Sequence, residues 1–414
     1  MTERRVVVTG MGAVSCAGND LASLWRSLAS GRSGIGRCTR FDTAGLPSAV
    51  GEVRDFAPPG VTPKEARRMA RATLFAAAAA DEAMAQAGFA EKLDPHIADP
   101  FRFGVLFSNS AGGLEEYDRA AGQLAGRGPG GVSAFFIPTF ISNGPAGTLA
   151  IRRGLRGPNF NPVSACASSA HAIGEAAWMI RRGDADLMLA GGAEACLTRL
   201  MMSGFHALTA LSTTEPPERA CRPFDLNRDG FVMAEGAGAL VLEELEHARR
   251  RGAAILAEVA GYGASCDACH ITAPAPDGSG LAYAICRALE MANCTSAEVG
   301  AVIAHGTGTV VNDRVEAAAL RTVFGPDPAA PKVSAIKSMI GHAFSASGAL
   351  SALAAVQVLR TGVLPPTLHY ETPDPACPLA VSAGPEAVDT RYLLTDNLGF
   401  GGHNAALLFR RWED

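Results

Sequence analysis

The stretch that decides the fold reads Asn161-Pro-Val-Ser-Ala-Cys-Ala-Ser-Ser-Ala-His-Ala-Ile-Gly-Glu-Ala-Ala-Trp-Met-Ile-Arg-Arg-Gly183. A short apolar segment, bounded by turn residues, ends at Cys166. A small-residue helical pattern then runs from Ala167 to Arg182, and Gly183 stops it. The Cys166 thiol is therefore expected at the positive end of a helix, which favours the thiolate. We expect Cys166 to act as a nucleophile.

A similar pattern returns later in the chain. Ala346–Gly362 aligns without gaps with Ala167–Gly183 and is identical at six of seventeen positions. Gly236-Ala-Gly-Ala-Leu-Val-Leu242 and Gly402-His-Asn-Ala-Ala-Leu-Leu408 are also alike, and each would close one half of the chain. These matches predict a duplicated α/β fold with halves at residues 1–250 and 251–414 and an active site between them.

Short apolar runs alternate with helical patterns, as in an α/β fold with buried strands. The runs are Arg5–Thr9, Phe103–Phe107, Leu187–Ala190, Ala239–Leu242, Val302–Ala304, Val333–Ile336, Tyr392–Leu394 and Ala405–Phe409. The glycine-rich stretch Leu124–Val132 is expected to be a loop.

Composition excludes several classes of protein. The net charge of −5 gives no reason to expect nucleic acid as a partner. No apolar run is long enough for a signal peptide or a membrane span, so we expect a cytoplasmic protein whose ten cysteines are reduced thiols. The sequence has no glycine–lysine phosphate loop and no clustered metal ligands, so we expect neither a metal nor a bound cofactor.

Two histidines follow in segments that resemble strand ends or helix starts. His305 lies in Ala304-His-Gly-Thr-Gly-Thr309, and His342 lies in Lys337-Ser-Met-Ile-Gly-His342. Either histidine alone would be read as a core or capping residue. Together with Cys166 they indicate acyl transfer through a thioester.

Eight blocks of the chain carry a resemblance to a known family. They are Val8-Thr-Gly-Met-Gly12, Ser164-Ala-Cys-Ala-Ser168, Ala190-Gly-Gly-Ala-Glu194, Arg222-Pro-Phe-Asp-Leu-Asn-Arg-Asp-Gly-Phe-Val232, His305-Gly-Thr-Gly-Thr309, Asn312-Asp313 with Glu316, Lys337-Ser-Met-Ile-Gly-His342 and Gly399-Phe-Gly-Gly-His-Asn404. Over essentially its whole length the chain resembles the β-ketoacyl-acyl-carrier-protein synthases, elongating condensing enzymes of the KAS I/II type in the thiolase superfamily. These enzymes act in fatty acid and type II polyketide synthesis.

The resemblance implies a fold and a reaction. The fold is thiolase-like, with two duplicated βαβαβαββ halves that form a five-layered αβαβα sandwich. The reaction is a decarboxylative Claisen condensation, in which an acyl chain held on cysteine is joined to malonyl-acyl-carrier-protein and grows by two carbons. The only prosthetic group implied is the phosphopantetheine that the carrier protein brings.

The resemblance also implies residue roles. Cys166 is the nucleophile, and His305 and His342 donate to the malonyl thioester oxygen and promote loss of CO2. Lys337 and Glu316 belong to a buried polar network that positions the histidines and tunes their protonation.

Further positions correspond to the substrate path. The backbone N–H groups of Cys166 and Phe400 correspond to the oxyanion hole, and Phe400 corresponds to the gate that moves when the acyl chain enters. Thr307 and Thr309 correspond to the residues that hold the phosphopantetheine arm. The remaining substrate-binding positions are Phe205, His270, Gly401 and Gly402.

Two features bear on specificity. Ala111 stands where the family usually has a branched residue in the acyl pocket, so we expect a pocket that admits long, stiff or unusual chains, such as polyenes. An acidic carrier protein needs a basic docking rim, and Lys64, Arg67, Arg68 and Arg71 supply one. Gly130-Gly131 and Thr209 replace basic residues of the typical enzymes, so carrier recognition is expected to differ.

Alternatives stay open at this point. The chain is expected to form a homodimer, or to be the active half of a heterodimer with a chain-length-factor homologue in a specialised polyketide pathway. A non-catalytic pocket-shaping subunit is a weaker reading, because such subunits lack the nucleophile. A thiolase would carry a second cysteine in Gly399–Asn404, and starter enzymes have asparagine at the position of His342.

Overall fold

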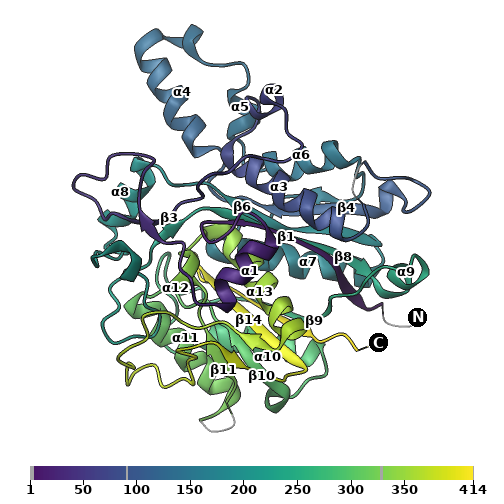
Figure 1. The fold of residues 1–414 in the computed structure, drawn as a ribbon, viewed down its shortest axis with the longest axis vertical. Helices are drawn as coiled ribbons and strands as arrows, with labels where there is room; N and C mark the ends of the chain where they lie inside the picture. The colour runs from purple at the N-terminus through teal and green to yellow at the C-terminus, as the bar shows by residue number, and fades with distance from the viewer. Residues whose placement is uncertain (1–3, 90–91, 327–329, 414) are drawn as a thin grey trace.

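A single ten-stranded sheet organises the molecule. The computed structural model describes residues 4–89, 92–326 and 330–413 (Figure 1). The strands of the sheet lie in the order β11-β10-β14-β15-β9-β1-β8-β6-β4-β5. Their bounds are β1 Val6–Ser15, β4 Phe103–Ser108, β5 Asn159–Phe160, β6 Leu187–Glu194, β8 Gly236–Glu244, β9 Ala257–Cys266, β10 Val299–Ile303, β11 Lys332–Ser334, β14 Tyr392–Gly399 and β15 His403–Arg410.

The two halves of this sheet repeat one another. In the first half β1 pairs antiparallel with β8 and β8 antiparallel with β6, whereas β6–β4 and β4–β5 are parallel. In the second half β9, β15, β14, β10 and β11 follow the same order with the same directions. The halves join where β1 pairs with β9, through Val7 opposite Glu258 and Val8 opposite Ala257.

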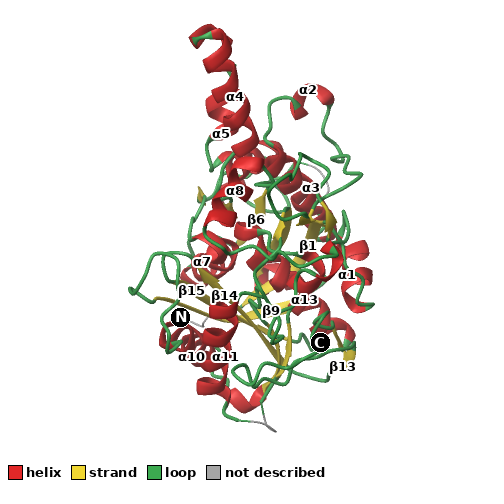
Figure 2. Cartoon of the chain, turned by 90° about the vertical axis from the view of Figure 1, so that its left-hand side faces the viewer, coloured by secondary structure: helices red, strands yellow, loops and turns green. Residues whose placement is uncertain are grey.

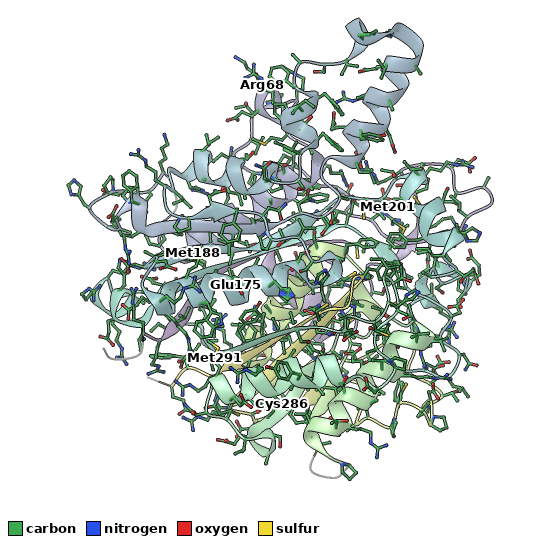
Figure 3. All side chains as sticks on the ribbon, turned by 180° about the vertical axis from the view of Figure 1, so that it is seen from behind. Arg68, Glu175, Met188, Met201, Cys286 and Met291 are labelled. Carbon is green, nitrogen blue, oxygen red and sulfur yellow. The ribbon has the colours of Figure 1, made fainter. Side chains whose placement is uncertain are left out.

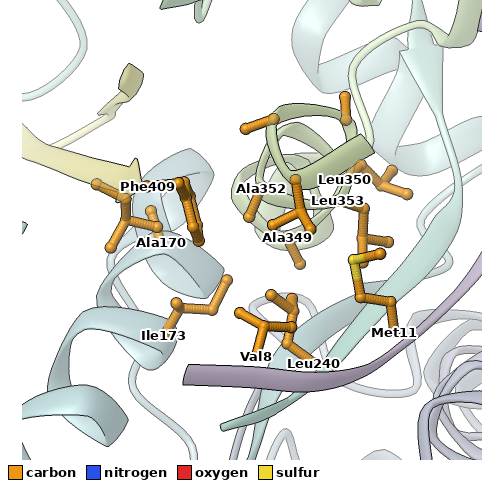
Figure 4. Close-up of a cluster of buried hydrophobic side chains, with 14 of the residues drawn as sticks. Val8, Met11, Ala170, Ile173, Leu240, Ala349, Leu350, Ala352, Leu353 and Phe409 are labelled. Atoms are coloured by element: carbon orange, nitrogen blue, oxygen red, sulfur yellow. The ribbon is translucent and has the colours of Figure 1, made fainter. Parts of the chain in front are cut away.

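Two buried helices pack between the halves. The helix α7 (Ser168–Arg182) and the helix α13 (Ser347–Thr361) contact each other and strands of both halves. Every residue of α13 from Ser347 to Leu359 is buried, as expected for a helix whose apolar residues lie on all sides with few polar ones among them. Figure 4 shows the apolar cluster in which α7 and α13 meet β1, β8 and β15.

Small residues allow this close approach. Gly348 lies where the two helices cross, and a Cβ atom there would come within 2.6 Å of the Ala170 nitrogen. Helix α7 ends at Gly183, whose φ of +84° is the left-handed conformation that glycine adopts at helix ends. The helix that was predicted from the sequence therefore ends at the expected residue and begins one residue later than expected, at Ser168.

The outer helices cover the other faces of the sheet. In the first half α3 (Arg71–Gln86) contacts β1, β8 and β6, and α6 (Gly144–Arg153) contacts β4. In the second half α10 (Ser279–Met291) contacts β9, β15 and β14, and it also packs on α11 (Val310–Phe324).

The remaining helices and strands complete the fold. The helices are α1 Leu21–Ala29, α2 Pro63–Ala66, α4 Leu114–Arg127, α5 Phe136–Phe140, α8 Arg199–Ala207, α9 Leu245–Arg250 and α12 Lys337–Ile340, and the strands of the two small sheets are β2 Gly36–Arg37, β3 Ala49–Gly51, β7 Met233–Ala234, β12 Val363–Leu364 and β13 Glu386–Ala387. Helix α4 projects from the body beside α5, with α2 nearby (Figure 2). The expectation of a loop over Leu124–Val132 was wrong in part, because α4 continues to Arg127.

The described residues contain neither a membrane-spanning helix nor a cluster of metal-binding side chains. None of the helices there has the length and apolar character needed to cross a bilayer. Within the same residues, histidines, cysteines and acids do not cluster in a way that would hold a metal ion.

Candidate active site

A strained turn presents Cys166. Residues Ala165–Ala167 form a short 3-10 turn that runs directly into α7, and Ala165 has a positive φ of 50°. The Ser168 hydroxyl accepts the Ser164 N–H at 2.8 Å and donates to the Ala165 carbonyl at 2.6 Å. These bonds hold a conformation that alanine rarely adopts, so the turn fixes the cysteine at the helix start.

The surroundings of the thiol act in opposite directions. Burial raises the pKa of the Cys166 thiol to about 12, whereas the charge of Lys337 and a hydrogen bond from the Phe400 N–H lower it. The expectation that the helix end makes a thiolate of the resting group is thus opposed by burial. Burial therefore favours the neutral thiol of Cys166, while the charge of Lys337 and the Phe400 N–H favour the anion.

His305 follows β10, and three polar side chains contact its backbone or its imidazole ring. Its backbone N–H donates to Asp396 Oδ1 at 2.9 Å. Lys337 Nζ lies 3.5 Å from its Nδ1, and Asn397 Nδ2 lies 3.3 Å from the same atom. Both neighbours are nitrogen donors, so Nδ1 accepts and the ring proton resides on Nε2.

His342 sits beside it at the end of the turn after α12. The two imidazole rings are 5.4 Å apart between centroids and perpendicular. The His342 ring stacks on Phe344 at 5.0 Å, and its Nδ1 lies 2.9 Å from the Ser347 hydroxyl. Burial and the charge of Lys337 hold the pKa of both histidines well below the ordinary value, so both rings are neutral at physiological pH.

A buried charge network lies behind His305. Lys337 is 1 % exposed, and its Nζ donates to the His305 carbonyl at 2.6 Å. Glu316 accepts the Gly306 N–H at 2.8 Å and the Asn312 amide at 3.1 Å. Burial and the neighbouring Asp396 raise the pKa of Glu316 well above its usual range, and burial lowers the pKa of Lys337.

Several polar residues of this network were missed by the sequence analysis. Asp396 is fully buried, and burial raises its pKa to about 6. Asn397 and Ser347, which contact the two imidazoles, were also not singled out. Asp396 and Asn397 lie within a strand and Ser347 begins a helix, so no local pattern marks them. Only the packing of β14 and α13 against the histidine loops brings these side chains into the site.

The loop Gly399–Gly402 packs directly on the cysteine turn. A Cβ atom at Gly399 would lie 2.5 Å from the Ser164 carbonyl oxygen and 3.3 Å from the Cys166 nitrogen. Phe400, the next residue, has 37 % of its surface exposed and faces Phe205 at 6.3 Å between ring centroids. The loop therefore brings the Phe400 N–H to the sulfur, and the partly exposed Phe400 lines the cavity.

The candidate residues converge on one cavity of about 500 Å³. Of the positions predicted from the sequence, those that line it are Ala111, Cys166, Phe205, His305, Thr307, Thr309, His342 and Phe400. Phe205 stacks on Phe344 at 5.1 Å and meets Phe231 edge-on at 5.3 Å, so aromatic rings form one wall. The cavity walls are mainly apolar, and the lining includes the imidazoles of His305 and His342 and the thiols of Cys166 and Cys196.

Two threonines mark another part of the cavity wall. Thr307 and Thr309 lie 3.0 Å apart between their hydroxyl oxygens. Thr307 also donates to Asp313, which in turn lies 3.6 Å from the buried Arg228. The hydroxyl pair is thus anchored to a buried ion pair.

Other predicted positions lie outside the cavity lining. His270 is exposed, and its Nδ1 accepts the N–H groups of Thr272 and Ala273, which do line the cavity. Gly401 bonds to the Ile271 carbonyl at 2.7 Å, and both Gly401 and Gly402 have positive φ. These residues shape the loops at the cavity mouth.

The predicted basic rim is divided by the fold. Lys64 is exposed in α2, and Arg67 is the first residue after this helix. Arg68 is seen beside α2 in Figure 3, and its guanidinium lies 4.8 Å from the Phe135 ring centroid. Arg71 instead pairs with the buried Glu235 at 2.6 Å and donates to the Val53 carbonyl.

Comparisons with known proteins agree over the whole chain. Residues 3–248 match the family model "Beta-ketoacyl synthase, N-terminal domain", and residues 256–371 match "Beta-ketoacyl synthase, C-terminal domain". The 3-oxoacyl-[acyl-carrier-protein] synthase 2 of Staphylococcus aureus (strain COL) is 43% identical over 415 residues, which is 99% of each chain.

Solved structures give the same result. The ishigamide ketosynthase/chain length factor superposes with a TM-score of 0.91 at 35% identity, with full coverage of both chains. A chain from the structure of a type II polyketide acyl-carrier protein in complex with its ketosynthase, bound to the hexaketide, superposes with a TM-score of 0.91 at 32% identity, also with full coverage of both chains.

Proposed function

Because the chain belongs to the beta-ketoacyl synthase family, we propose that Cys166, His305 and His342 carry out its condensation of an acyl thioester with malonyl-acyl-carrier-protein. The observation that supports these roles best is their convergence on one cavity from three separate segments. The chain is a 3-oxoacyl-[acyl-carrier-protein] synthase, an acyltransferase that extends an acyl chain by two carbons.

The first half-reaction loads Cys166. Its sulfur attacks the carbonyl carbon of the acyl thioester, the bond to the pantetheine sulfur breaks, and the thiol proton passes to the departing pantetheine thiolate. The N–H groups of Cys166 and Phe400 stabilise the oxyanion, supported by the hydrogen bond of Phe400 to the sulfur and the contact of Gly399 with the turn. The charge of Lys337 favours the sulfur anion as it forms.

The second half-reaction needs neutral donors. When malonyl thioester loses CO2, negative charge develops on its thioester oxygen, and Nε2–H groups of His305 and His342 donate to it. The carbanion then attacks the acyl carbonyl on Cys166, a carbon–carbon bond forms, the carbon–sulfur bond breaks, and the sulfur leaves as the thiolate, which takes up a proton to restore the thiol. Lys337 and Glu316 hold His305 in place through the His305 carbonyl and the Gly306 N–H.

The cavity wall suggests how substrates lie. Thr307 and Thr309 present a hydroxyl pair that suits the amide groups of a phosphopantetheine arm. Ala111, Phe205 and the gate residue Phe400 bound the acyl chain, and His270, Gly401 and Gly402 support the loops at the entrance. The small side chain of Ala111 supports long or stiff acyl chains as substrates.

A carrier protein and a second chain are the proposed partners. Lys64, Arg67 and Arg68 form the docking rim, without Arg71, which is committed to Glu235. For the second chain we propose the face around the edge strand β5, where Ile151, Phe160 and Val163 are exposed apolar residues. The occupant is a second copy of this chain or a homologous chain-length factor, and light scattering of the protein alone distinguishes a homodimer from a monomer.

The architecture fits the same proposal. Residues 1–250 and 251–414 form the two thiolase-like halves, supported by the repeated strand order. The layers of the αβαβα sandwich correspond to α3 with α6, the first half-sheet, α7 with α13, the second half-sheet, and α10 with α11.

A second candidate function is the active half of a ketosynthase/chain-length-factor pair in a polyketide pathway. The likeness to such a pair among solved structures favours it. The two functions share the chemistry and differ in partner and substrate.

Mass spectrometry tests the residue roles directly. The protein is incubated with a panel of acyl-carrier-protein thioesters, and the acyl adduct is mapped by peptide mass. We expect an adduct on Cys166, its loss in C166S and its retention in C294S, which removes another buried thiol away from the cavity. An adduct that persists in C166S would refute the assignment.

A further inference from the structure

The hydrogen bond between His342 and Ser347 assigns a role to a serine outside the cavity lining. His342 Nδ1 and Ser347 Oγ lie 2.9 Å apart, and the two residues are 3 % and 4 % exposed. We propose that Ser347 is a positioning residue for decarboxylation: its hydroxyl donates to Nδ1 of His342 and keeps the ring proton on Nε2, which serves the cavity. The inference rests on the proposed function of His342.

Packing fixes the orientation of the His342 ring but does not determine whether Nδ1 or Nε2 carries the proton. Phe344 stacks on one face of His342 with an interplanar angle of 21°, and Phe231 meets the ring edge-on at 5.4 Å. Neither phenyl ring has a polar atom, so neither distinguishes Nδ1–H from Nε2–H. Among the described residues, Ser347 is the polar group that contacts a nitrogen of this imidazole.

The serine hydroxyl decides between the tautomers. If Nδ1 carried the proton and donated to Ser347, the buried hydroxyl would need another acceptor for its own proton. The described part of the chain provides none, whereas donation to Nδ1 satisfies both groups with one bond. Lys337 disfavours a second proton on the ring, so the imidazole is neutral with its proton on Nε2.

The other half of the chain shows that this use of serine is specific to its site. Ser168 occupies the same place in the repeat, as the first residue of α7. There the hydroxyl stabilises the cysteine turn: it accepts the Ser164 N–H and donates to the Ala165 carbonyl. At the start of α13 the equivalent hydroxyl reaches back five residues to the imidazole instead. The position therefore caps a turn in one half and orients a reactive ring in the other.

The experiment separates the two half-reactions. S347A is compared with wild type for acylation of Cys166 by acyl-carrier-protein and for release of CO2 from malonyl-carrier-protein. Loss of the preferred tautomer should slow CO2 release by about 10- to 100-fold, corresponding to the loss of one buried hydrogen bond. Acylation should stay within about twofold, because Ser347 makes no contact with the cysteine turn in the hydrogen-bond network.

A matched control lies one turn along the same helix. Ser351 is 1 % exposed and its hydroxyl has no partner among the described residues, so S351A removes an equally buried hydroxyl without touching His342. S351A should leave both half-reactions unchanged. Equal slowing of both half-reactions in S347A, unchanged CO2 release in S347A, or a matching loss in S351A would overturn the proposal.

Nitrogen NMR of ring-labelled histidine reports the tautomer directly and requires neither enzyme turnover nor folded S347A. Wild type should show His342, assigned by loss of its signal in H342A, as the neutral Nε2–H tautomer. An Nδ1–H tautomer in wild type would overturn the proposal even if S347A failed to fold. Failure of Cys166 to become acylated in wild type would instead count against the proposed function, since the tautomer is measured independently.

Discussion

Substitution of Gly399 by alanine tests the contact between the gate loop and the cysteine turn. The added methyl group would lie 2.5 Å from the Ser164 carbonyl oxygen, about 1 Å inside an ordinary van der Waals contact. Gly399 has no positive φ, so alanine is compatible with its backbone and the effect comes from its contacts with the cysteine turn, of which the one to Ser164 is the shortest. The turn is braced by the Ser168 hydroxyl, so we expect the loop to move.

The expected magnitude follows from the donor that moves with the loop. Overpacking of this kind costs about 1–3 kcal/mol. Relief of the clash shifts the Phe400 N–H away from the oxyanion, and loss of one such donor costs about 10²- to 10³-fold in rate. We therefore expect G399A to slow acylation of Cys166 by about 100-fold while the protein remains folded.

Time-resolved intact mass after mixing with acyl-carrier-protein measures this rate, and circular dichroism checks the fold. The control is G384A, because a Cβ atom at Gly384 has no neighbour within 4 Å. Acylation of folded G399A at the wild-type rate would refute the reasoning. So would an equal loss in G384A.

Three further predictions concern the cavity and the buried charges. A111I narrows the acyl pocket, so acylation by long-chain carrier-protein thioesters should fall while short chains still react; unchanged chain-length selectivity would contradict the assignment of Ala111. K337M removes a charge that lowers the pKa of Cys166, so the pH profile of Cys166 alkylation by iodoacetamide should move to higher pH, and an unmoved profile would show that Lys337 does not act on the sulfur. Burial raises the pKa of Asp396 from 3.8 to about 6, so its contribution to stability is present below pH 3.8 and is lost as the pH rises through 6. Urea unfolding of wild type and D396N between pH 4 and 7 should show a steeper loss of stability with rising pH in wild type than in D396N, and parallel curves would contradict it.

Much of the fold could be predicted from apolar runs. Each of the eight runs corresponds to a strand, and the helix from Ala167 to Gly183 was placed to within a residue. Strand β9 was missed because Gly261 and Gly263 interrupt its pattern. The structure explains both glycines: a Cβ atom at either position would lie within about 2 Å of a carbonyl oxygen of α10.

The sequence identified only those site residues that lie in short segments with a recognisable pattern. Cys166, His305 and His342 stand in short distinctive segments, and all three line the cavity. Asp396 and Ser347 were not predicted, because their roles depend on burial and on contacts with distant segments. Arg71 was predicted to be part of a basic surface. Its guanidinium instead pairs with the buried Glu235, which is 164 positions away in the sequence.

The crossing of α7 and α13 at Gly348 has a consequence for how the protein fails. The sulfur is delivered by one helix of that crossing, while an imidazole is anchored on the other, and the two half-sheets share a ladder of only two residue pairs. Reactive groups are thus kept in register by interior packing rather than by a continuous backbone ladder. Weaker packing of α7 against α13 would move Cys166 away from His342. Enzyme turnover would therefore be lost before either half of the protein unfolds.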